Sequence, residues 1–198
     1  MRTSIPIISA LLLAVAGAAP AADVLVNGGF ESGAGVGWQE VGGGYELILP
    51  GEESPVDPHD GGYLAWLGGA DGATHELWQE VVVPAGTARL TLRCWTWISS
   101  QEPSGAAHDI LTFALRTTSG DPIETLISLS NLDHAAAWTE VAASASAAHA
   151  GETIRVQILA QTDGSLTTNF FLAQVALLAS TSTPVQGETW GGVKALYR

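Results

Sequence analysis

Hydrophobic and polar residues alternate in short runs along most of this chain, and turn-forming residues separate the runs. In the segment 153–161, Ile154, Val156 and Ile158 fall on one face of an extended strand, whereas Arg155 and Gln157 fall on the other. Alternation with a period of two over four to eight residues is typical of a strand with one buried face. Gly, Pro, Asp and Ser end nearly every run. The pattern therefore predicts an all-β chain.

The predicted strands are short and follow one another closely, which favours an antiparallel β-sandwich, or jelly roll, in a single domain. They comprise residues 24–26, 45–49, 63–67, 76–83, 89–98, 110–116, 123–129, 138–144, 153–161 and 170–178. The alanine-rich stretch 135–150 is compatible with a short helix on propensity alone. The alternation in 138–141 instead favours a strand followed by a turn.

The two ends of the chain differ from this pattern. Residues 1–22 combine Arg2, an apolar run from 5 to 18 and the small residues Ala19-Pro20-Ala21, which is typical of a cleaved signal peptide. The run is too short to cross a membrane. We therefore expect a secreted protein, extracellular or on the cell surface, with its sandwich in residues 23–179. A Ser/Thr/Pro linker and a C-terminal tail then occupy 180–198.

Charge narrows the range of partners. The chain carries 7 Lys and Arg against 20 Asp and Glu, a net charge of -13, and loss of the leader removes only Arg2 from the charged residues. Nucleic-acid binding requires basic patches, so we exclude nucleic acid as a partner. Cys94 is the single cysteine, which excludes an intramolecular disulfide. Its alternation with Leu90, Leu92 and Ile98 predicts a buried thiol in the core.

Several motifs in the predicted sandwich resemble galactose-binding-like jelly rolls, which include many carbohydrate-binding modules appended to secreted bacterial hydrolases. They are LVNGGFESG (25–33) followed by Trp38, GYLAWLGG (62–69), LWQEVVVPAG (77–86) and AGETIRV (150–156). The resemblance implies the same fold, a role in binding, and a structural calcium ion with Glu31 as one ligand. Members commonly place two acidic residues on the last strand, where this chain has Ala173 and Gln174. The alternative is that Glu31 hydrogen-bonds the backbone near the first turn.

Motifs for catalysis are missing from the sequence, so we expect no enzyme: there is no His-Glu-x-x-His, Gly-x-Ser-x-Gly or phosphate-binding loop. The five histidines are scattered along the sequence. One of them, His108, precedes Asp109 at the start of a predicted strand, where either residue is able to reach a cation at the end of a loop. The acidic cluster Glu52, Glu53, Asp57 and Asp60 lies in a Pro/Gly-rich segment, which favours a solvated or cation-binding loop.

The predicted ligand-binding residues are Arg93, Trp95 and Trp97, which share the face of their strand opposite Cys94. Aromatic faces pack against the C–H faces of sugars, and an arginine hydrogen-bonds hydroxyls or carboxylates. The alternative is that loops cover this face and both indoles pack beneath them. We expect the other tryptophans of the predicted sandwich to have packing roles: Trp38, Trp66, Trp78 and Trp138.

The tail is apolar and basic on an acidic protein. Its candidate docking residues are Trp190, Lys194, Tyr197 and Arg198, which either engage an envelope partner or fold back on the domain.

The leading hypothesis is a secreted, non-catalytic module that binds carbohydrate or another extracellular surface component. The alternative is a structural or adhesion protein of the bacterial envelope or extracellular matrix, docked through this tail. A third hypothesis is an accessory domain that acts on a hydrolase in trans.

Overall fold

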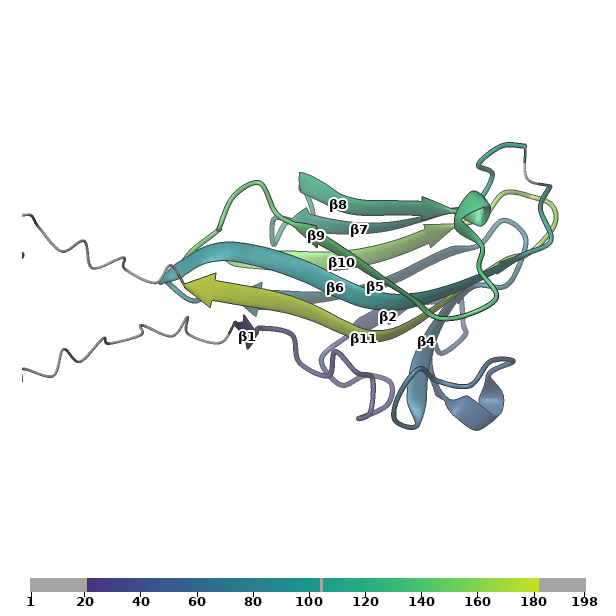
Figure 1. Cartoon of the computed structure of the whole chain (residues 1–198), viewed down its shortest axis with the longest axis horizontal. Helices are drawn as coiled ribbons and strands as arrows, with labels where there is room; N and C mark the ends of the chain where they lie inside the picture. Colours follow the sequence, from purple (N-terminus) through teal and green to yellow (C-terminus); the bar gives the residue numbers. More distant parts are fainter. Residues whose placement is uncertain (1–20, 104, 182–198) are drawn as a thin grey trace, which may run out of the picture. The chain divides into compact units, whose positions relative to one another are not determined.

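Two antiparallel sheets pack face to face in the part of the chain described by a computed structural model, residues 21–103 and 105–181. Sheet A has the strand order β3-β4-β11-β6-β9, with β1 beside β11, and sheet B has the order β2-β5-β10-β7-β8. Figure 1 shows the sheets as two layers, with the long strands β6 and β11 side by side. The predicted all-β sandwich is therefore confirmed.

The strands are β1 (Ala22–Asp23), β2 (Gln39–Val41), β3 (Ile48–Pro50), β4 (Tyr63–Gly68), β5 (Thr74–Val82), β6 (Thr87–Ser100), β7 (Ile110–Arg116), β8 (Pro122–Ser130), β9 (Thr139–Ser144), β10 (Thr153–Gln161) and β11 (Thr168–Thr181). Two short 3-10 turns, η1 (Gly51–Glu53) and η2 (Asn131–Asp133), are the helical elements of the described residues. In that same part of the chain, no helix has the length and apolar character to cross a membrane.

The core lies between the sheets, where the alternating apolar residues of β6 and β11 face those of β5, β7 and β10. Ile154, Val156 and Ile158 are buried as their alternation predicts. Cys94 is also fully buried, which confirms a core thiol. Burial raises the pKa of this thiol far above its ordinary value, so it stays protonated and unreactive in the folded state.

Near the N-terminus the predicted strand boundaries are wrong. The edge strand is β1 at Ala22–Asp23, and the chain leaves sheet A after Val24, because the Val26 N–H donates to the side chain of Gln79 (2.9 Å) in sheet B. Strand β2 was missed because it has only three residues. The predicted strand 45–49 begins instead at Ile48, since a turn around Gly42–Tyr45 precedes it. The alanine-rich stretch holds β9 and no helix, as expected.

The residues that the structure describes include little of the two chain ends. The predicted leader lies outside the described residues except for Ala21 and Ala22, and the four candidate docking residues of the tail lie outside them altogether. Strand β11 continues through Ser180 and Thr181, the first two residues of the predicted linker.

Candidate functional site

The predicted ligand-binding residues lie together on the outer face of sheet A. Arg93, Trp95 and Trp97 alternate along β6 with the buried Leu92 and Cys94, as the pattern requires. The guanidinium of Arg93 is exposed but forms an ion pair with Glu140 on the neighbouring strand β9. This contact uses one of the N–H donors that the prediction offered to a ligand.

The segment 51–62, which we call the η1 loop, contacts Trp95 directly and reaches Trp97 through Trp138. The imidazole of His59 stacks on Trp95, with ring centroids 3.9 Å apart and planes at 16°. Trp138 meets Trp97 edge to face at 6.0 Å, and its Nε1–H donates to the Asp57 carbonyl (3.1 Å) in the same loop. These contacts favour the packing alternative for both indoles. A glycan platform at these residues stays a prediction.

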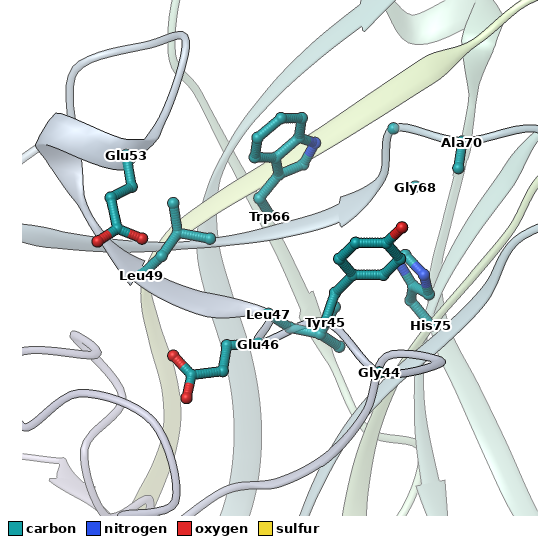
Figure 2. Close-up of a pocket in the computed structure, with 11 residues that line it drawn as sticks. Gly44, Tyr45, Glu46, Leu47, Leu49, Glu53, Trp66, Gly68, Ala70 and His75 are labelled. Atoms are coloured by element: carbon teal, nitrogen blue, oxygen red, sulfur yellow. The ribbon is translucent and has the colours of Figure 1, made fainter.

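A cleft of about 570 Å³ lies at the β3/β4 edge of sheet A, away from the predicted residues. The loop before β3, strands β3 and β4, the turn after β4 and the start of β5 supply its walls. The lining residues are Gly44, Tyr45, Glu46, Leu47, Leu49, Glu53, Trp66, Gly68, Gly69, Ala70 and His75. Figure 2 shows the carboxylates of Glu46 and Glu53 toward one end and the rings of Tyr45 and His75 toward the other.

Two aromatic rings of this cleft come from different elements. Tyr45 lies in the loop before β3, and 74% of its surface is exposed. Trp66 is half-buried on β4, where its Nε1–H donates to Asn169 Oδ1 (3.0 Å) and its ring packs on Phe171. Gly69 allows the turn to approach this indole, because a Cβ there would lie 2.8 Å from Trp66 Nε1. The Trp66 ring is therefore held in one orientation, whereas the Tyr45 ring is free.

The polar groups of the cleft are acidic or neutral. Glu46 and Glu53 make no ion pair within the described residues. His75 is buried, and its Nδ1 has no hydrogen-bond partner in that part of the chain. Burial lowers the pKa of His75, which keeps the imidazole neutral near pH 7. Two aromatic rings, an apolar floor of Leu47 and Leu49, and carboxylate acceptors suit an uncharged ligand rich in hydroxyl groups.

Glu31 lies at a third position, beneath the end of the η1 loop. Its carboxylate accepts from the backbone N–H groups of Gly62 (2.9 Å) and Tyr63 (3.3 Å). Gln174 stands where the resemblance implied an acidic residue, and its Nε2–H donates to Asp60 Oδ2 (2.8 Å). The contacts of Glu31 are the backbone hydrogen bonds expected if this residue binds the backbone near the first turn in place of an ion. The calcium ion at Glu31 remains a prediction.

A group of acidic residues that fits a metal ion lies elsewhere. One oxygen each from Glu102, Asp109 and Asp163 lies within 4.8 Å of the other two. Burial raises the pKa of Glu102; His108 opposes this shift, and the charges of Asp163, Asp109 and Asp71 add to it. The sequence signal for this group was the pair His108-Asp109, whereas nothing in the sequence connects Glu102 or Asp163 to it.

The acidic residues predicted in the loop 52–60 lie apart from this group. One of them, Glu53, lines the cleft.

The remaining tryptophans lie where packing was expected, with one exception. Trp38 is fully buried, and Trp78 lies on the outer face of sheet B beneath Arg155, whose Cζ is 3.8 Å from the ring centroid. Trp66 packs on Phe171 but also lines the cleft. A signal for the cleft exists in hindsight: Tyr45 follows the flexible run Gly42–Gly44, which predicts an exposed ring at a turn.

The sandwich was compared with proteins of known structure. The carbohydrate-binding module TmCBM61, solved with β-1,4-galactotriose, matches with a TM-score of 0.58 and 18% identity over 80% of this chain and 99% of the module. This chain has the fold of that module. The K3 cleaved adhesin domain of Lys-gingipain from Porphyromonas gingivalis matches with a TM-score of 0.54 and 13% identity, over 80% of this chain and 98% of that domain.

The carbohydrate-binding-module fold also occurs inside larger proteins. The enzymatically active domain of bacteriophage CBA120 tailspike protein 4 matches over 79% of this chain but 21% of that chain, with a TM-score of 0.52 and 11% identity. No family model and no curated protein matches the sequence. At these identities the comparisons establish the fold.

Proposed function

We propose that this domain is a secreted, non-catalytic carbohydrate-binding module whose sugar lies in the cleft between Tyr45 and Trp66. The observation that carries the proposal is the exposed Tyr45 ring in a cleft with the oriented Trp66 indole. Sugar rings present apolar C–H faces that pack on aromatic rings, and a ring already held in place loses little entropy on binding. The cleft volume of about 570 Å³ lies within the range of small-molecule sites.

Charge selects the kind of sugar. The carboxylates of Glu46 and Glu53 accept hydrogen bonds from hydroxyl groups but repel carboxylates and sulfates. The net charge of -13 adds to this repulsion. A neutral oligosaccharide is therefore the expected ligand, whereas the platform predicted at Arg93 also accepts sugars that bear carboxylates.

Three further elements belong to the proposal. The leader 1–22 directs export to the extracellular space or cell surface, and the tail residues Trp190, Lys194, Tyr197 and Arg198 dock an envelope partner. A calcium ion at Glu31 is the less favoured part, because both carboxylate oxygens already accept backbone hydrogen bonds. A structural or adhesion role is the alternative function, and the fold shared with a gingipain adhesin domain is compatible with it.

The test is a glycan array followed by calorimetry on the purified protein, with β-1,4-galactotriose among the first neutral probes. Tyr45→Ala is the main variant, because the exposed ring makes few contacts whose loss would disturb folding. We expect Tyr45→Ala and Trp66→Ala each to weaken binding at least tenfold. Trp95→Ala together with Trp97→Ala should leave the affinity within threefold of the parent.

Two results would contradict the proposal. Absence of binding to any neutral glycan would favour the adhesion alternative. Binding that survives Tyr45→Ala and Trp66→Ala but is lost in the Trp95 and Trp97 variants would place the ligand on the outer face of sheet A instead. Thermal melts of all variants verify that each one is folded.

A further inference from the structure

Two loops at one end of the sandwich bring three carboxylates together from distant parts of the sequence. Glu102 follows β6, Asp109 directly precedes β7, and Asp163 follows β10. Figure 1 shows the β6–β7 and β10–β11 loops side by side at one end, and the Asp163 N–H donates to Asp109 Oδ1 (2.7 Å) between them. One oxygen from each residue lies within 4.8 Å of the other two.

Two of the three carboxylates in this group have a buried oxygen that the described residues around it leave without a partner. Asp109 has no exposed surface, yet its Oδ2 accepts no hydrogen bond within the described residues. The Oε1 of Glu102 is also buried without a partner in the same part of the chain. A buried carboxylate oxygen without a hydrogen bond is costly, and such charges normally pair or coordinate a metal.

The neighbouring groups do not balance this charge. The nearest basic group is His108, whose Nδ1 lies 3.3 Å from Asp163 Oδ2 and carries at most one positive charge. Asp71 in the β4–β5 loop adds a further negative charge to the surroundings of Glu102. Three carboxylates around a common centre are thus left with a negative excess that a divalent cation would neutralise.

We propose that Glu102, Asp109 and Asp163 form a calcium site, separate from the one predicted at Glu31. An all-oxygen set favours a hard cation such as calcium or magnesium over zinc. Oxygens on opposite sides of a calcium ion lie about 4.6–5.2 Å apart, against about 4.0–4.2 Å for magnesium. The three oxygens lie within 4.8 Å of one another, which is compatible with calcium and its adaptable coordination geometry. Water molecules complete its coordination.

The site connects to the wall of the cleft. Thr162, beside Asp163, accepts through Oγ1 from the Ala73 N–H (2.7 Å) and donates from the same hydroxyl to the Ala70 carbonyl (2.7 Å). The Gly72 N–H also donates to the Asp163 carbonyl. A cation on Asp163 therefore stiffens the β4–β5 turn, in which Ala70 lines the cleft.

Calcium chloride is the probe, added to the purified full chain after treatment with EDTA and dialysis. We expect about one equivalent of calcium to bind by calorimetry, with magnesium weaker. The melting temperature should rise by about 5–10 °C at a calcium concentration a hundredfold above Kd. Asp109→Asn and Glu102→Gln should each weaken calcium binding at least tenfold. In EDTA both variants should melt no lower than the parent, because each removes an unpaired charge.

Two control variants separate this site from others. Asp121→Asn removes an exposed charge at a distant turn and should leave calcium binding unchanged, whereas Glu31→Gln reports on the other predicted calcium position. No heat and no calcium-dependent melting shift in the parent would overturn the proposal. Calcium binding that persists in Asp109→Asn but is lost in Glu31→Gln would also overturn it. Both readouts are independent of sugar binding, so a failure here leaves the cleft proposal intact.

Discussion

Glu31 provides a direct measure of how the η1 loop is held on sheet A. Its carboxylate accepts from the Gly62 N–H at 2.9 Å and from the Tyr63 N–H at 3.3 Å. A hydrogen bond to a charged group contributes about 1.5–3 kcal/mol, and an exposed one lies at the lower end. With one short and one long contact, Glu31→Ala should lower the free energy of unfolding by about 2 kcal/mol. For a chain of this size, that lowers the melting temperature by about 4–8 °C.

The assay is thermal unfolding followed by circular dichroism, performed in EDTA and repeated with added calcium. Glu31→Gln is the matched variant, because it keeps one side-chain oxygen and should lose about half as much. Gly61→Ala tests the same contact from the other side, since a Cβ there would lie 2.1 Å from Glu31 Oε1. A change of less than 1 °C in Glu31→Ala would refute the reasoning. A loss seen with calcium but absent in EDTA would assign Glu31 to an ion instead.

Two further predictions concern buried titratable groups. Cys94 is fully buried, so a thiol reagent should leave it unlabelled in the native protein and label one thiol per chain in denaturant; rapid native labelling would refute its place in the core. Burial lowers the folded-state pKa of His75 below about 6.5, so its stabilising contribution is complete above that pH and falls as the pH falls. The melting difference between the parent and His75→Gln should therefore change between pH 7 and pH 5, and a constant difference would contradict this.

The fold was largely predictable because the alternation of apolar and polar residues along a strand follows directly from which of its faces is buried. The segment 153–161 and the segment around Cys94 became strands with the expected faces toward the core. The strands at the N-terminal end were harder to predict. Segment 24–26 is apolar enough for a strand, but the hydrogen bond that the Val26 N–H donates to Gln79 Oε1 directs it elsewhere. A contact across 53 residues leaves no local signal in the sequence.

The site was harder to predict because it depends on strand neighbours and loop conformation. The pattern placed Arg93 and Trp95 on one face of a strand, but not Glu140 beside Arg93 or His59 on Trp95. Both contacts follow from the order β11-β6-β9 and from the path of the η1 loop. The cleft likewise joins Tyr45 and Trp66, which lie on separate elements and whose proximity depends on the turns between them.

The central claim is that sugar packs on Trp66 and Tyr45 rather than on the indoles of β6. Nuclear magnetic resonance of the 15N-labelled protein resolves the Nε1–H signals of the seven tryptophans, assigned by single substitutions. The neutral oligosaccharide with the highest array signal is then titrated. The proposed site predicts that the Trp66 signal shifts in a saturable manner while those of Trp95 and Trp97 stay in place. Saturable shifts of Trp95 and Trp97 with an unchanged Trp66 would contradict it.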